Sequence, residues 1–257
     1  MGEVKALDQI SSKRLKTLES FDYQWKHLSE APYLLSDIDW RKNVSSYILD
    51  ELGLTREDIR GKRVLDAGCG NGRWAYGFVQ LGCEVFGFDP SKNGIEYARE
   101  HVDGCTFDVA DVLDIESLKK IYPGESFDIV WCWGVLHHTG DPELGFVNLL
   151  KFLAPSGRIH LYLYGKRRKI KSILSFVYNL FPFEIRVFLS KMLSKINQVS
   201  AHSNFDRFSP PISISHSEDE VRHWFVENSL TFKRVYPRWA SGSTDLFISG
   251  MYRQPEV

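Results

Sequence analysis

The sequence predicts an α/β fold in which helices cover both faces of a mostly parallel β-sheet. The chain has 257 residues, 43% of them hydrophobic and 25% charged, so it is long enough and apolar enough for a large globular core. From Arg63 onward, short β-rich runs alternate with helical patterns. A glycine-rich turn follows the first of these runs directly, at residues 68–72. These observations exclude collagen-like, disordered and coiled-coil proteins.

Residues 1–60 are mostly helical in pattern and are expected to form an N-terminal cap. Gly53 is expected to end a helix, because glycine readily adopts the left-handed conformation that terminates helices. The segment shows no separate hydrophobic core. We therefore expect it to pack over the edge of the sheet where a ligand binds.

Residues 61–165 are expected to form the core, which contributes five parallel strands. These strands are predicted at Arg63–Asp66, Glu84–Phe88, Thr106–Val109, Phe127–Trp131 and Ile159–Tyr164. The intervening helices have their own start signals. Asp114 can cap one helix, and Asp141 can cap another that has Pro142 at its first position. These caps place the helix starts at the carboxyl ends of the strands.

Residues 166–210 interrupt the alternation and are expected to form a basic helical lid insertion. Lys166 to Ser194 have the pattern of one or two amphipathic helices around Pro182. Between positions 166 and 195, eight Lys and Arg residues stand against one acid, Glu184, although the whole chain has a formal charge of -1. Three interpretations remain open: a solvated lid face, a pocket for an anionic substrate such as a phosphorylated or uronic-acid sugar, and a helix on a membrane surface.

Residues 211–257 are expected to complete the core sheet. Ser217, with Glu220 three residues later, has the spacing of a capping box and predicts a helix start. Two further strands are expected at Thr231–Val235 and Leu246–Met251. An antiparallel hairpin that closes one sheet edge is the simplest arrangement for them, which brings the sheet to seven strands.

The glycines at 68, 70 and 72 indicate a ligand with little phosphate character. Gly68, Gly70 and Gly72 form GxGxG, whereas Arg73 stands where the dinucleotide fingerprint requires its third glycine. A pyrophosphate needs that full fingerprint, but an amino acid with a sulfonium does not. An NAD-linked dehydrogenase is therefore disfavoured. Asp66, just before the turn, can face an ammonium group or orient the loop.

Two acids follow the next strands. Asp89 ends the second predicted strand and is placed to accept hydrogen bonds from both hydroxyls of a ribose. Asp111 follows the third strand and has two interpretations: it accepts the exocyclic amine of adenine, or it is a solvated loop carboxylate or helix cap. Phe88 and Val112 would form apolar walls on either side of the base.

Four segments, in this order and spacing, resemble the class I S-adenosylmethionine-dependent methyltransferases, in particular those of the methyltransferase-11/12-like, small-molecule type. The segments are DAGCGNG (66–72), GFDP (87–90), ADVLD (110–114) and SFDIVWCWGVLHHTGDPE (126–143). The resemblance spans roughly residues 20 to 252 and is strongest from Val64 to Leu163. It implies a Rossmann-like seven-stranded sheet with an antiparallel last strand and S-adenosylmethionine across the carboxyl ends of the first four strands.

The resemblance also implies roles for particular residues in binding the cofactor. Trp133 would lie near the methionine moiety through its backbone, and Tyr23 and Trp25 would belong to an aromatic N-terminal element that covers the cofactor. The cofactor-binding residues expected from the motifs are Asp66, Gly68, Gly70 and Gly72 on the methionine side, Asp89 at the ribose, and Asp111 and Val112 at the adenine.

Methyl transfer to a hydroxyl benefits from a base, and two histidines are candidates for this role. His137 and His138 follow the fourth predicted strand, where the substrate enters. In the alternative interpretation, at least one of them packs or orients the loop. Tyr164, at the end of the fifth strand, is expected to bind substrate, whereas Tyr162 is expected in packing. The sequence contains no carboxylate and histidine cluster typical of a metal site, so transfer is predicted to be independent of metal.

The sequence therefore predicts a methyltransferase (EC 2.1.1.-) that acts on an oxygen of a small molecule or glycan intermediate, including an anionic one. Two rivals stay open: an RNA or protein methyltransferase whose basic insertion docks the polymer, and a non-catalytic binding subunit with this fold. The four cysteines show no CxxC pair, and no signal peptide is evident, so a cytoplasmic location is expected. No apolar run is long enough to cross a bilayer, although contact with a membrane surface stays open.

Overall fold

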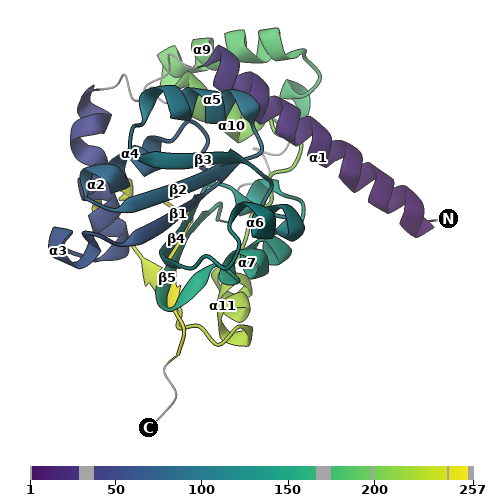
Figure 1. Ribbon diagram of the computed structural model, residues 1–257. Helices are drawn as coiled ribbons and strands as arrows, with labels where there is room; N and C mark the ends of the chain where they lie inside the picture. The colour runs from purple at the N-terminus through teal and green to yellow at the C-terminus, as the bar shows by residue number, and fades with distance from the viewer. Residues whose placement is uncertain (1, 29–37, 166–174, 198–199, 242, 254–257) are drawn as a thin grey trace.

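A computed structural model describes residues 2–28, 38–165, 175–197, 200–241 and 243–253, and it contains one seven-stranded sheet (Figure 1). The strand order is β3-β2-β1-β4-β5-β7-β6. The strands are β1 (Arg63–Ala67), β2 (Glu84–Asp89), β3 (Cys105–Val109), β4 (Phe127–Trp133), β5 (Leu153–Leu163), β6 (Lys233–Val235) and β7 (Leu246–Met251). Among these strands, β7 runs antiparallel to both of its neighbours, β5 and β6, and the other neighbouring pairs are parallel. The predicted fold class is confirmed.

The strand register brings the predicted ligand-binding segments to one edge of the sheet. β1 pairs in parallel with both β2 and β4, and Ala67 at the end of β1 lies opposite Phe88 near the end of β2. The glycine turn after β1 and Asp89 on β2 therefore lie side by side. In a parallel sheet, the crevice outside the carboxyl ends of the strands is where ligands bind.

Helices cover both faces of the sheet, and each layer has its own hydrophobic core (Figure 1). One face carries α2 (Ile38–Leu52), α3 (Arg56–Ile59), α4 (Arg73–Gln80) and α5 (Lys92–His101), which pack around the buried Trp131 and Phe78. The other face carries α6 (Ile115–Ile121), α7 (Pro142–Leu150) and α11 (Glu218–Glu227), which pack around Phe146 and Phe225. Short 3-10 helices are formed by Leu136–His138 (η1) and Arg238–Ala240 (η2).

The helix-start signals are confirmed. Asp114 accepts a hydrogen bond from the backbone N–H of Ser117 at 3.0 Å, and Asp141 accepts one from Leu144 at 3.1 Å. Ser217 and Glu220 form a complete capping box at the start of α11. These side chains satisfy backbone N–H groups that the first helical turn leaves without a partner.

Replacing Ser217 with alanine is expected to lower the free energy of unfolding by about 1 kcal/mol, because the Glu220 N–H loses its side-chain acceptor. Urea denaturation measures the change, with Ser126→Ala, at an exposed loop serine, as the control. Equal stability of the two variants would show that the cap contributes nothing.

The N-terminal segment divides into two parts that pack in different places. α1 (Gly2–His27) crosses the carboxyl edge of the sheet, as expected for a cap. α2 does not, because its buried Val44 and Ile48 face Gly77 of α4 on the sheet's face, where a Cβ on Gly77 would meet Ile48 at 2.7 Å. The expectation that all of residues 1–60 cover the ligand edge is therefore wrong for α2. Gly53, with φ of +61°, ends α2 as predicted.

The insertion supplies α9 (Phe183–Asn197), which begins directly after Pro182, and α10 (Ala201–Phe208). Five of the basic residues counted in the insertion, between 166 and 171, lie outside the described residues. The largest difference from the predicted strands is in β5, which begins at Leu153. β6 is shorter, beginning at Lys233, β4 extends to Trp133, and β1, β2 and β3 differ by single residues. Within the described part of the chain, no helix is long and apolar enough to cross a membrane.

Candidate active site

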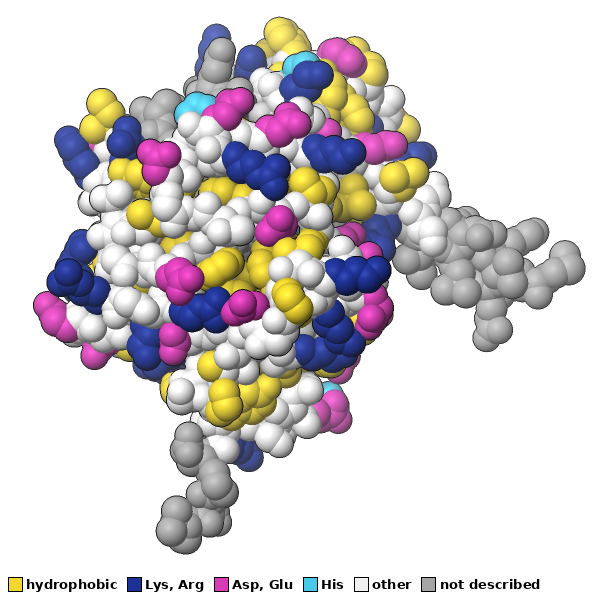
Figure 2. Space-filling view, viewed as in Figure 1, with side chains coloured by type: hydrophobic (Ala, Val, Ile, Leu, Met, Phe, Trp, Pro, Cys, Tyr) yellow, Lys and Arg dark blue, Asp and Glu magenta, His cyan; other side chains and the backbone are white. Residues whose placement is uncertain are grey.

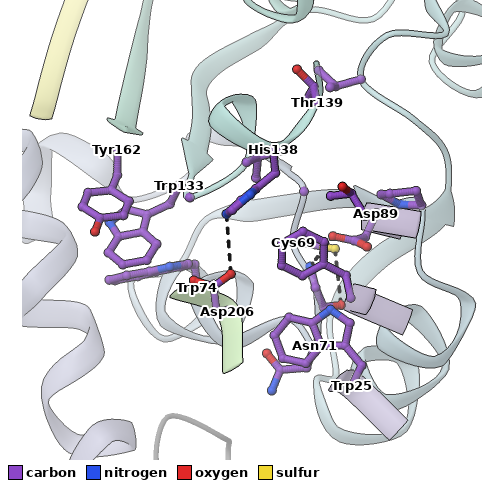
Figure 3. Close-up of a pocket in the computed structure, with 18 of the residues that line it drawn as sticks. Trp25, Cys69, Asn71, Trp74, Asp89, Trp133, His138, Thr139, Tyr162 and Asp206 are labelled. Atoms are coloured by element: carbon purple, nitrogen blue, oxygen red, sulfur yellow. Dashed lines mark hydrogen bonds and ion pairs between the residues drawn. The ribbon is translucent and has the colours of Figure 1, made fainter. Parts of the chain in front are cut away.

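A cavity of about 270 Å³ opens at the carboxyl edge of the sheet, and α1 and α10 close it from the other side (Figure 3). Its lining residues come from the loops after the strands, from α1, from α10 and from η2. The sequence-predicted site residues among them are Gly68, Gly70, Asp89, Asp111, Val112, Trp133, Trp25, His138 and Tyr164. Asp66, Gly72, Tyr23 and His137 are not among the lining residues.

The glycine turn lets the backbone approach other groups closely at two positions. Gly68 has φ of +75°, and a Cβ there would lie 2.3 Å from Val135. Gly70 has φ of +53°, and a Cβ there would lie 2.4 Å from the Trp25 ring. Gly72 instead caps α4 and packs against the layer of α5. The first two glycines thus shape the cavity, and the third joins the turn to the helix.

Asp66 lies outside the cavity lining, on β1 next to the glycine turn. Its side chain is buried and accepts a hydrogen bond from the backbone N–H of Ala75 in α4. Burial raises the pKa of Asp66 to about 7, although the hydrogen bond from Ala75 and the charge of Arg73 oppose this. This placement favours the loop-orienting interpretation over contact with an ammonium group.

Asp89, the last residue of β2, lines the cavity and accepts hydrogen bonds from two backbone N–H groups. Its Oδ2 accepts the backbone N–H of Gly70 at 3.0 Å, and its Oδ1 accepts that of Ser91 at 2.8 Å. Burial raises the pKa of Asp89 to about 6. Since each oxygen is fixed by one backbone donor, the remaining lone pairs can accept hydroxyl hydrogens in the cavity. A ribose diol matches this acceptor.

Asp111 has both a loop role and a place in the cavity wall. Its Oδ1 accepts the backbone N–H of Leu113 at 2.9 Å, and its Oδ2 forms an ion pair with Arg14 of α1. Phe88 and Val112, which were predicted as apolar walls for the base, also line the cavity. Asp111 therefore remains a candidate for the adenine amine, with Arg14 as a second group on the same carboxylate.

One face of α1 contributes to the cavity. The lining residues recur at helical spacing and are Arg14, Thr17, Leu18, Phe21 and Trp25. Asp22 attaches the helix to α5, because its carboxylate accepts hydrogen bonds from the hydroxyl of Ser91 and the amide of Asn93.

Tyr23 lies on another side of α1. Its ring stacks on Phe183 with the ring centroids 4.9 Å apart, so the structure places it at the contact with α9 and not over the cofactor site. Two residues apart on a helix, Tyr23 and Trp25 cannot share a face. Within the aromatic N-terminal element, residues 21–25, Phe21 and Trp25 thus line the cavity but Tyr23 does not.

An aromatic wall forms the side of the cavity at β4 and β5. Trp133 and Tyr162 stack with their ring centroids 4.0 Å apart, and both line the cavity. The expectation that Tyr162 serves only in packing is wrong, because residues 162 and 164 lie on the same side of the strand's carboxyl end. The side chain of Trp133, and not only its backbone, faces the cavity. Its indole N–H donates to Glu51 at 3.3 Å, which fixes the ring.

The two histidines have different environments. His137 is fully buried and stacks on the Tyr164 ring at 3.8 Å, outside the cavity lining. His138 lines the cavity, and its Nδ1 lies 2.6 Å from the carbonyl oxygen of Ile212. Because a carbonyl only accepts, Nδ1 carries the proton. The other ring nitrogen of His138, Nε2, is then the basic atom when the ring is neutral.

Asp206 of α10 lies close to both His138 and Tyr164. Its Oδ1 lies 3.6 Å from Nε2 of His138, and its Oδ2 accepts the hydroxyl hydrogen of Tyr164 at 2.7 Å. Figure 3 shows His138 directed at Asp206, with Trp133 and Tyr162 on one side of them and Asp89 and Trp25 on the other. This carboxylate lies beside the one ring nitrogen of a neutral His138 that can accept a proton. The arrangement can therefore take up a proton inside the cavity.

Several cavity residues were not identified from the sequence. They come mainly from the lid and η2 and are His202, Ser203, Asp206, Arg207 and Trp239, together with Asn71 and Arg73 next to the glycines. The burial of His202 lowers its pKa to about 4, so it is neutral at physiological pH. Only the helical spacing of α10 gives a signal, since His202 and Asp206 are four residues apart. Among the described residues, no three His, Cys, Asp or Glu side chains are grouped to hold a metal ion.

The strand order, with the glycine turn after β1 and the acid at the end of β2, is that of the class I S-adenosylmethionine-dependent methyltransferase fold. The resemblance predicted from the sequence is confirmed by comparison, since residues 59–175 match the family described as "Methyltransferase domain". The DhpI–SAH complex matches with a TM-score of 0.57 and 18% identity, over 94% of this chain and 98% of that one. Magnesium protoporphyrin IX methyltransferase of Synechocystis with bound SAH matches with a TM-score of 0.52 and 18% identity, over 83% of each chain.

Two groups of curated relatives match parts of the chain. A tRNA U34 carboxymethyltransferase of Helicobacter hepaticus is 28% identical over 164 residues, which cover 61% of this chain and 50% of the relative. A ubiquinone biosynthesis O-methyltransferase of Thiobacillus denitrificans is 34% identical over 105 residues, which cover 40% and 44%. The chain thus spans about half the length of the curated relatives it matches.

Proposed function

We propose that the protein transfers a methyl group from S-adenosylmethionine to a hydroxyl oxygen of a small molecule or glycan intermediate, with His138 as the general base. The cofactor, when bound, supplies an electrophilic methyl group on a sulfonium and leaves as S-adenosylhomocysteine. The relatives named ubiquinone biosynthesis O-methyltransferases support oxygen as the acceptor atom.

The residues present fit this cofactor. Asp89 offers two fixed carboxylate oxygens for the ribose, and Phe88 and Val112 offer apolar walls for the adenine. Gly68 and Gly70 line the cavity and carry no side chain, so their backbone can face the ligand.

The observation that carries the proposal is the group formed by His138, Asp206 and Tyr164 in the wall of the same cavity. An acceptor hydroxyl that hydrogen-bonds to Nε2 of His138 can lose its proton to that atom. The carboxylate of Asp206 then stabilises the imidazolium. Positioning of the acceptor supplies the larger part of the rate, and the base adds to it.

The charge of the acceptor depends on which basic residues reach the cavity. Arg207 of α10 lines it, which supports an anionic acceptor. Arg186 does not contribute, because its guanidinium donates to the carbonyl oxygens of Phe181 and Asn179 inside the lid. One of the three interpretations of the basic insertion was a pocket for an anionic substrate. Among the described residues of the insertion, this interpretation rests on Arg207.

The affinity for S-adenosylhomocysteine is expected to fall as the pH drops through about 6, by up to tenfold per pH unit below it. The pKa of Asp89 is raised to about 6, so the carboxylate that accepts the ribose hydroxyls is present above this pH and is lost by protonation below it. Calorimetric titration between pH 5 and 8 measures the change. In Asp89→Asn, the fall centred near pH 6 should disappear, whereas Asp66→Asn should keep it; a fall centred near pH 6 that persists in Asp89→Asn would refute the assignment.

Turnover tests the proposed activity. We expect release of S-adenosylhomocysteine with at least one acceptor from a panel of phenols, catechols and sugars, with and without carboxylate or phosphate groups. EDTA should leave the rate unchanged, since transfer is predicted to be independent of metal. Loss of activity in EDTA and its restoration by Mg²⁺ would contradict metal independence. Methylation only of nitrogen or carbon acceptors would contradict the oxygen assignment.

A polymer substrate is the second candidate, because one relative is named a tRNA U34 carboxymethyltransferase. In that case the basic insertion would dock RNA, and binding would weaken steeply with salt. Filter retention of labelled tRNA at low and high salt distinguishes the two. Salt-sensitive retention would favour the polymer, and no retention at low salt would support the small acceptor.

A further inference from the structure

We propose that the outer face of the lid is a docking surface for a lipid bilayer with anionic headgroups. This outer face consists of the exposed side chains of residues 176–196. Within the described residues, eight of the fourteen exposed large hydrophobic side chains lie in this segment. They are Phe176, Val177, Leu180, Phe181, Ile185, Phe188, Met192 and Ile196.

Along α9 these side chains form one continuous stripe. Ile185, Phe188, Met192 and Ile196 recur at helical spacing, and Phe188 and Ile196 are 61% and 76% exposed. The opposite side of α9 faces the protein through Ser190, which is fully buried and hydrogen-bonded to Tyr178. An ordinary surface helix has the reverse arrangement, with apolar residues inward. Within the part of the chain that the structure describes, the stripe therefore has no function in packing.

The charge around the stripe identifies its partner. Lys191 and Lys195 are exposed on one flank of it, and Glu184 is the only acid against eight basic residues between positions 166 and 195. Figure 2 shows hydrophobic side chains at the upper edge of the molecule, where α9 lies, with basic and acidic side chains among them. Apolar side chains that enter the acyl boundary while lysines reach lipid phosphates are typical of interfacial helices.

A second copy of the chain fits this surface less well. Two such faces would bring lysines of both copies together, and like charges oppose that contact. The position of the lid supports a bilayer, because α10 lines the cavity through Asp206 and Arg207 while the neighbouring α9 carries the stripe outward. Docking would place the cavity near the interface. It does not depend on methyl transfer, so its failure would leave the proposed function intact.

Co-sedimentation with vesicles tests the proposal. The probes are phosphatidylcholine alone and an equal mixture with phosphatidylglycerol. We expect binding to the mixed vesicles that weakens with salt, and Phe188→Glu/Ile196→Glu should reduce it by about tenfold or more. Lys191→Glu/Lys195→Glu should remove the preference for the anionic vesicles. Leu144→Glu/Val226→Glu, at exposed apolar positions outside the lid, is the matched control and should bind as the wild type does.

The variants change exposed side chains, so their circular dichroism and their affinity for S-adenosylhomocysteine should stay at wild-type values. Absence of wild-type binding to the mixed vesicles would overturn the proposal, as would equal binding by Phe188→Glu/Ile196→Glu. Analytical ultracentrifugation tests the alternative that a second copy of the chain binds this face. A dimer that dissociates in Phe188→Glu/Ile196→Glu, without vesicle binding by the wild type, would assign the face to self-association.

Discussion

Replacing Asp89 with alanine is expected to weaken the binding of S-adenosylhomocysteine by at least about 100-fold, because the two charge-assisted hydrogen bonds that we propose between Asp89 and the ribose would be lost. The same change removes the acceptor of the Gly70 and Ser91 backbone N–H groups, which shape the wall of the cavity. Both effects lower the affinity for S-adenosylhomocysteine. Calorimetric titration measures the affinity, and a denaturation curve shows whether the protein remains folded.

Two further variants separate these effects. Asp89→Asn keeps an oxygen acceptor and should lose less affinity than Asp89→Ala. Asp103→Ala removes an exposed carboxylate outside the cavity and should bind as the wild type does. Wild-type affinity in a folded Asp89→Ala variant would show that the acid at the end of β2 does not hold the ribose.

Replacing His138 with alanine is expected to lower kcat by about 100- to 10,000-fold, the usual contribution of a general base. Binding of S-adenosylhomocysteine should change little. His138 lies beside Asp206 and Tyr164, and Asp89 lies on another side of the cavity. The measurement compares turnover and cofactor affinity on the same protein, with any acceptor that the panel identifies.

His137→Ala is the matched control. His137 is fully buried against the Tyr164 ring, so its removal should lower the free energy of unfolding by about 2 kcal/mol. A base would show the opposite pattern, with slow turnover at normal stability. Full activity of His138→Ala would refute its role as the base.

The fold, and the position of the glycine turn beside Asp89, could be predicted because their signals are local in the sequence. The turn at Gly68–Gly72 needs left-handed backbone, and Asp89 ends a strand whose register with β1 follows from the parallel sheet. The face of α1 was only partly recognised. The helical spacing from Arg14 to Trp25 predicts which side chains share a face, and it would have excluded Tyr23.

The acceptor half could not be predicted because distant segments decide it. His137 and His138 are neighbours in one short turn, and only the Ile212 carbonyl and the Tyr164 ring distinguish them. Asp206 belongs to a lid whose position depends on tertiary contacts of α10 with α1, including the hydrogen bond from Gln24 to the His202 carbonyl. Its local sequence offers only the four-residue spacing from His202, which does not show that this helix reaches the cavity.

Titration of the wild-type protein with S-adenosylhomocysteine, S-adenosylmethionine and NAD⁺ is the most direct test of the cofactor assignment. We predict that each adenosyl sulfur compound binds once per chain, that the two compete for one site and that NAD⁺ does not bind. Failure of both S-adenosyl compounds to bind, or tighter binding of NAD⁺, would contradict the proposal that this cavity serves methyl transfer.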